Sequence, residues 1–105
     1  MEYFFAYDQM GSVIRSPTEA QMEELLLSLS TCDPEHPDVG ISHSSGWSLS
    51  AFPNGLLVFE NVLTQELPRH MQPLPAAQTL KLWIELAAGN YQHLLTLPWA
   101  AGYGT

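Results

Sequence analysis

The hydrophobic pattern is clearest between residues 47 and 62, where two short apolar runs flank a turn. Within the turn Pro53-Asn54-Gly55, proline presets φ, asparagine tolerates the second corner, and glycine accepts the left-handed position that closes the loop with a bulge. A three-residue loop pairs Leu49 with Phe59 and sorts the side chains by face. One face then holds Leu49, Ala51, Leu57 and Phe59, on which we expect the helices to pack. The other face holds Ser48, Ser50, Val58 and Glu60, and we expect it to be free to meet a partner.

Other segments also have the composition of strands. Residues 3–7 are rich in aromatic side chains, and a turn at 8–11 separates them from a short returning strand at 12–15. Residues 39–43 form a strand that leads into the hairpin through the turn at 44–46. The sequence therefore predicts an antiparallel sheet of four or five strands, built as a meander around the hairpin at 47–62.

Two segments have helical periodicity, over about residues 17–30 and 75–88. Ser16, Pro17 and Glu19 have the spacing of a capped start for the first helix. The second helix begins at Pro75 and ends before Gly89, with an apolar stripe formed by Ala76, Leu80, Trp83, Ile84 and Ala87.

A short helical turn is expected at 91–95, whereas residues 64–75 and 97–105 contain prolines and are expected to be irregular. These elements predict an α+β fold in which two helices pack on one face of the sheet. The length of 105 residues is that of a single domain, residues 1–105.

The net charge of the chain limits the kinds of molecule that it is expected to bind. Eleven acids face three bases, which gives a net charge of −8. Such a chain disfavours nucleic acid and anionic membranes, because binding to phosphate needs clustered Lys or Arg. It suits a basic protein partner, whose encounter it would accelerate. An acidic surface that only keeps the protein soluble is the simpler explanation on charge alone.

The remaining compositional features indicate a cytoplasmic protein. The single cysteine, Cys32, excludes an internal disulfide and is compatible with a reducing compartment. The first residues lack the basic region of a signal peptide, and no apolar run approaches the length of a membrane span.

No catalytic or metal-binding signature is present in the sequence. His36, His43, His70 and His93 match no compact ligand spacing, and the acidic loop at 33–38 lacks the glycine and terminal glutamate of a calcium loop. Neither Cys32 nor any serine lies in a nucleophile motif. We therefore expect no enzyme activity, no metal and no cofactor. An enzyme with scattered catalytic residues, such as His43 with His70, is a third class of function.

The tryptophans and Arg69 are expected to have structural roles rather than to form a binding site. Trp47 and Trp83 are expected in the core, whereas Trp99 is expected to be exposed or to hold the C-terminal tail in place. Arg69 is expected to pair with one of the acids of the chain.

The small size, the acidity and the tryptophan-centred α+β pattern resemble those of bacterial immunity proteins. Such proteins are encoded beside the toxins of polymorphic or contact-dependent systems and neutralise them by binding. The segments that are similar to a set of small bacterial proteins are 46–52, 60–61, 68–71, 82–83, 88–90 and 98–99. The resemblance implies a protein that binds a cognate toxin and occludes its active site.

A toxin that attacks nucleic acid or nucleotides has a basic cleft, so exposed acids are the expected contacts. The predicted partner-binding residues are Asp33, Glu35, Asp38, Glu23, Glu24, Glu60 and Trp99. The alternative function is a small regulatory or adaptor domain without catalytic activity, which would form a homodimer through an exposed strand edge.

Overall fold

The computed structural model describes residues 2–29, 38–64 and 66–102. Two predicted contact residues, Asp33 and Glu35, lie outside the described residues, as do Cys32 and His36. The elements are β1 (Phe4–Tyr7), β2 (Val13–Arg15), α1 (Glu19–Ser28), β3 (Val39–His43), β4 (Trp47–Ala51), β5 (Leu57–Asn61), β6 (Glu66–Met71), α2 (Ala76–Ala87), α3 (Tyr91–Leu95) and β7 (Ala100–Ala101).

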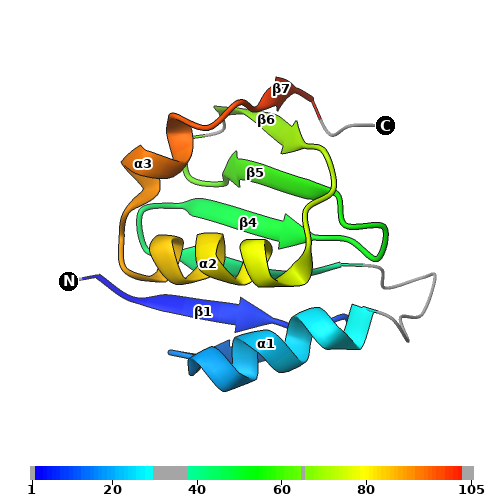
Figure 1. Cartoon of the computed structure of the whole chain (residues 1–105). Coiled ribbons are helices and arrows are strands. Elements are labelled where there is room, and N and C mark those ends of the chain that lie inside the picture. The colour runs from blue at the N-terminus through cyan, green and yellow to red at the C-terminus, as the bar shows by residue number, and fades with distance from the viewer. Residues whose placement is uncertain (1, 30–37, 65, 103–105) are drawn as a thin grey trace.

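The described strands form one antiparallel sheet in the order β2-β1-β3-β4-β5-β6-β7 (Figure 1). The predicted α+β class and the antiparallel meander are confirmed, since β3 to β6 are neighbours in chain order. The predicted size of four or five strands is wrong, because the sheet has seven. Strand β1 lies between β2 and β3, so α1 carries the chain across β1.

The hairpin of β4 and β5 has the predicted register. Leu49 pairs with Phe59 and Ala51 pairs with Leu57. The Phe52 amide donates to the Leu56 carbonyl at 3.0 Å, and Gly55 has a φ of 89°, a left-handed value that glycine adopts without strain. The turn sequence thus fixes which side chains face the helices.

Strand β6 lies in the segment 64–75, which the sequence predicts to be irregular because of its prolines, Pro68 among them. In the structure, Asn61 pairs with Glu66 and Phe59 pairs with Arg69, so two residues of β6 lie opposite Glu60. This arrangement is a β-bulge, in which Pro68 occupies a position that needs no ladder N–H. A proline therefore fits a strand in which Glu66, Arg69, His70 and Met71 pair with β5. The tail contributes one further element, β7, which pairs Ala101 with Arg69.

Helix α1 begins later than predicted. Ser16 has a φ of 47°, and its amide donates to the Phe4 carbonyl, so it completes the β1–β2 ladder instead of capping a helix. Thr18 is the N-cap: its hydroxyl oxygen accepts from the Gln21 amide, and its own amide donates to the Gln21 side-chain oxygen, which completes a capping box.

Helix α2 has the predicted ends, with Pro75 at the N-cap and Gly89 at a φ of 86° after the C-cap. Its buried face consists of Thr79, Trp83 and Leu86. The predicted stripe is therefore right at Trp83 but displaced elsewhere, since Leu80 and Ile84 are only partly buried. Helices α1 and α3 contact α2 and cover part of its other surface.

The core lies between the helices and one face of the sheet (Figure 1). Trp83 is fully buried against this face, and α1 contributes Met22, Leu25 and Leu26. The core residues from the strands are Ala6, Val39, Ile41, Trp47, Leu49, Ala51, Leu57 and Phe59. Trp47 and Trp83 are thus core residues, as predicted.

No helix of the described residues covers the opposite face of the sheet, yet several side chains on this face are buried. Ser48 and Ser50 are each 6% exposed and Val58 is 3% exposed. The Tyr7 ring crosses this face over Gly40, and its hydroxyl lies 2.6 Å from the Ser50 hydroxyl. The sequence indicated a face free to meet a partner, and this was wrong for these three side chains.

The close approach of Tyr7 to Gly40 predicts a specific effect of adding a methyl group. In Gly40→Ala, the new Cβ would overlap the hydroxyl and ring of Tyr7. We expect a loss of about 2 kcal/mol in the free energy of unfolding, measured with urea, which is typical of overpacking. In a Tyr7→Ala background, the same substitution should cost well under half as much. An equal cost in both backgrounds would contradict this explanation.

Candidate functional site

The exposed face of α1 is acidic. Glu19, Glu23 and Glu24 are all exposed, and this helix has no Lys or Arg. Leu27 lies one turn beyond Glu23 and Glu24 and is 60% exposed. The two predicted contact residues on α1, Glu23 and Glu24, therefore lie beside an exposed apolar side chain.

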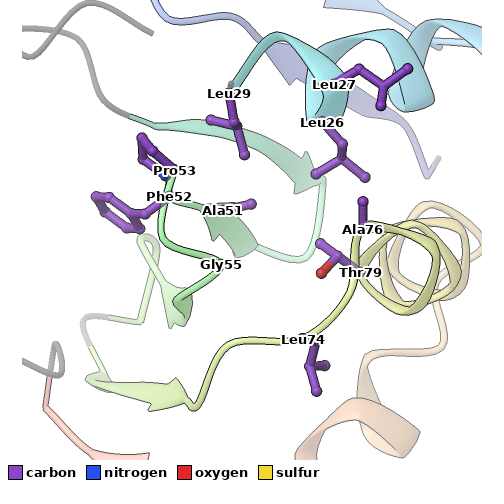
Figure 2. A pocket seen from close by; sticks show the side chains of 10 residues that line it. All are labelled: Leu26, Leu27, Leu29, Ala51, Phe52, Pro53, Gly55, Leu74, Ala76 and Thr79. Carbon is purple, nitrogen blue, oxygen red and sulfur yellow. The ribbon is translucent and has the colours of Figure 1, made fainter. Parts of the chain in front are cut away.

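Two apolar hollows adjoin this face. The larger has a volume of about 280 Å³ and lies between α1, the start of α2 and the turn at 53–55 (Figure 2). Leu26, Ala76 and Thr79 line it on the helix side. The smaller, of about 190 Å³, includes Glu23 in its lining, and both hollows include Leu26, Leu27 and Ala76. Acids and apolar surface thus meet between α1 and α2.

Asp38, a third predicted contact, is only partly exposed and belongs to the Tyr7 cluster on the other face of the sheet. The Tyr7 hydroxyl donates to Asp38 Oδ2 at 3.4 Å. Burial raises the pKa of Tyr7 from 10.0 to about 12; the hydroxyl contact with Ser50 opposes this increase and the nearby Asp38 carboxylate adds to it. The structure places Asp38 on a different surface from Glu23 and Glu24.

Glu60 and Trp99 are also far from the acidic helix in the fold. Glu60 lies on β5 opposite Ser48 and is partly exposed. Trp99 is partly buried: its ring stacks on Phe59 at 5.1 Å between centroids, and its Nε1–H donates to the Leu94 carbonyl at 2.6 Å. Trp99 therefore holds the C-terminal segment against the sheet, which is one of its two predicted roles.

Arg69 lies over the aromatic core. Its guanidinium carbon is 5.4 Å from the centroid of a Trp47 ring, which in turn stacks on Phe59 at 4.6 Å. Its ion-pair partner is Glu66, with a distance of 3.9 Å between Nη2 and Oε1. Arg69 thus has an acidic partner, as predicted, but the contact is long. The cation–π contact with Trp47 could not be read from the sequence, because it joins two strands across the sheet.

His43 has the most constrained environment of the described histidines. It is 4% exposed, and its Nδ1 accepts from the Ser45 amide at 3.0 Å and lies 2.8 Å from the Ser45 hydroxyl. Its Nε2 lies 3.5 Å from a carboxylate oxygen of Glu2. Because the Ser45 backbone occupies Nδ1, this nitrogen is poorly placed to take a proton from the hydroxyl. The geometry is that of a side chain that caps the turn at 44–46.

His43 and His70 are not brought together in one cluster. His70 Nδ1 lies 3.1 Å from the Gly102 carbonyl, at the β6–β7 end of the sheet, whereas His43 ends β3. Among the described residues, no group of three or more His, Cys, Asp or Glu side chains could hold a metal ion. None of the helices in the described part of the chain has the length and hydropathy to cross a membrane.

Comparisons with models of known protein families, with curated proteins and with solved structures find no match to this chain. The candidate site is therefore defined by its own geometry. It is the α1 surface, which we define as Glu19, Glu23, Glu24 and Leu27 together with the adjoining hollows.

The raised pKa of Tyr7 predicts a loss of stability at high pH. The folded pKa of about 12 exceeds the ordinary value of 10.0, so the stabilising contribution is complete below pH 10. It is lost as the pH rises from 10 to 12, because the unfolded chain ionises first. We expect a loss of roughly 1 to 2 kcal/mol from this group, after allowance for its partial exposure.

The measurement is urea unfolding at pH 9 and pH 11.5, compared between the unmodified chain and Tyr7→Phe. The variant should lose less stability between the two pH values. Tyr3→Phe is the matched control, since the Tyr3 side chain is 61% exposed. The same pH dependence in Tyr7→Phe and the unmodified chain would refute the assignment.

Proposed function

We propose that this chain is an immunity protein that binds a cognate bacterial toxin and occludes its active site. The observation that carries the proposal is the α1 surface, where three exposed carboxylates adjoin Leu27 and two apolar hollows. An apolar centre with a charged border is the usual composition of a protein-binding surface.

Charge supports a basic partner. The net charge of −8 attracts a cationic surface at long range, and the absence of Lys or Arg from α1 leaves its carboxylates without a basic neighbour on the same helix. A toxin that acts on nucleic acid or nucleotides has to bind phosphates, so its active site is positively charged. A surface with exposed carboxylates would compete for that site.

The apolar part of the α1 surface would slow dissociation of the complex, which charge alone does little to slow. Charged groups at the border of an interface mainly affect the association rate, whereas buried apolar contacts slow dissociation. Leu27 offers an apolar side chain, and the hollow of about 280 Å³ offers a receptor for one from the partner. Together these features suit a stable complex.

The alternative of a homodimer through a strand edge has weaker support. The edge strands of the described sheet, β2 and β7, are three and two residues long. Short edges offer few ladder hydrogen bonds to a second copy. Two copies that each carry a net charge of −8 would also repel one another.

The proposal is tested by purifying this chain with the toxin domain encoded beside it and measuring the association rate at 50 and 500 mM salt. We expect inhibition of the toxin and an association rate at least tenfold lower at high salt. An association rate that does not change with salt would exclude the part of the proposal in which the carboxylates compete for the positively charged active site. Failure to bind or inhibit the toxin would exclude the proposed function.

Charge reversal on α1 is expected to weaken this complex. Glu23→Lys and Glu24→Lys should each lower the association rate about threefold to tenfold and leave the unfolding midpoint nearly unchanged, since both side chains are exposed. The matched control is Gln72→Lys with Gln92→Lys, which changes the net charge by the same two units at exposed positions elsewhere. An equal effect of the control would show that net charge acts without a defined surface.

A further inference from the structure

A separate hollow lies at the other end of the sheet, between β6, β7 and the segment that follows α3. Its volume is about 340 Å³, which is near the lower end for sites that bind small molecules. Its walls are mostly apolar, and the side chains that matter below are Leu67, Arg69, Leu95, Leu97 and Trp99. We call it the β6–β7 pocket.

The aromatic wall of this pocket is Trp99, and contacts with other residues hold its ring in place. Trp99 stacks on Phe59, and Phe59 stacks on Trp47, with 5.1 and 4.6 Å between ring centroids. The Trp99 indole N–H is fixed by the Leu94 carbonyl at 2.6 Å. Because these rings are already ordered, a ligand that packs on Trp99 would not have to immobilise it.

Arg69 is the charged group in the wall. A guanidinium has five N–H donors in a planar arrangement, and no hydrogen bond uses them within the described residues. Its contact with Trp47, at 5.4 Å from the ring centroid, is a cation–π contact and is not a hydrogen bond to an acceptor oxygen. Its ion-pair partner, Glu66, is 3.9 Å away and 48% exposed, so this pair is weak.

These features specify the chemistry of a ligand. A carboxylate matches the paired N–H groups of one guanidinium, and an apolar body matches Trp99, Leu95 and Leu97. A phosphate dianion fits less well, because the described lining offers one cation and Glu66 lies beside it. We propose that the β6–β7 pocket binds a carboxylate borne on an apolar group, through Arg69 and Trp99. This site is independent of the α1 surface.

The test uses 4-phenylbutyrate as the probe and 4-phenylbutanamide as its uncharged counterpart, with binding followed by tryptophan fluorescence and by NMR of the indole N–H groups. The acid should bind at least tenfold more tightly than the amide and should shift the Trp99 resonance. Arg69→Gln should remove this preference, and Arg69→Lys should reduce the affinity for the acid about fivefold, because lysine lacks the paired donors.

Glu66→Gln is the decisive variant. It leaves Arg69 in place and removes the competing carboxylate, so affinity for the acid should rise about threefold. Arg15→Gln, which removes a cation from β2 at the other edge of the sheet, is the matched control and should change nothing. Circular dichroism checks that each variant is folded.

The proposal is overturned if the amide binds as well as the acid, if Arg69→Gln keeps the preference in a folded protein, or if Glu66→Gln fails to raise the affinity. A tetrapeptide ending in phenylalanine, with a free or an amidated C-terminus, distinguishes the two sources of such a carboxylate. Tighter binding of the free peptide than of 4-phenylbutyrate assigns a chain end, and the reverse assigns a small organic acid.

Discussion

The pairing of Leu49 with Phe59 across β4 and β5 is the constraint on which the rest of the fold depends. It places Leu49, Ala51, Leu57 and Phe59 on the face that Trp83 covers. A slip by one residue would move Ser48 and Ser50 beneath the helices and bury their hydroxyls among apolar side chains. The Trp83 indole N–H already lacks an acceptor within the described residues, so the core has little tolerance for further unsatisfied polar groups.

The same pairing connects the core to the surface. Phe59 lies between Trp47 and Trp99 in the aromatic stack, and Arg69 covers Trp47 from β6. The position of the guanidinium is therefore determined by core residues. In contrast, the α1 surface depends on the packing of Met22, Leu25 and Leu26, which leaves Glu23 and Glu24 in solvent. The two ends of the sheet thus present different chemistry on one scaffold.

Local signals were sufficient where one short segment determines the outcome. Pro53-Asn54-Gly55 determines a register, and the spacing of Met22 and Leu25 determines which side of α1 is wet. Local signals failed where a residue distant in the sequence determines the local structure. Pro68 argued against a strand, but a bulge opposite Glu60 accommodates it. Ser16 had the spacing of a cap, but the β1–β2 ladder uses its amide. The contact of Arg69 with Trp47 and the hydrogen bond between Tyr7 and Asp38 depend on strand order, which no local pattern contains.

The bulge in β6 has a consequence for insertions and deletions. Glu66 lies opposite Asn61, and both share the helix-covered side with Phe59. Since side chains alternate along a strand, the bulge is what returns Arg69 to that side and leaves His70 opposite Val58. Removal of one residue between Glu66 and Arg69 would leave a single residue opposite Glu60, so regular pairing would keep Arg69 opposite Phe59 and His70 opposite Val58. Insertion of one residue there, with the bulge kept, would place His70 opposite Leu57, in the core, and would move Arg69 off Trp47. The segment can therefore lose one residue without a change of register, whereas a gain of one residue would exchange the faces of the strand beyond it.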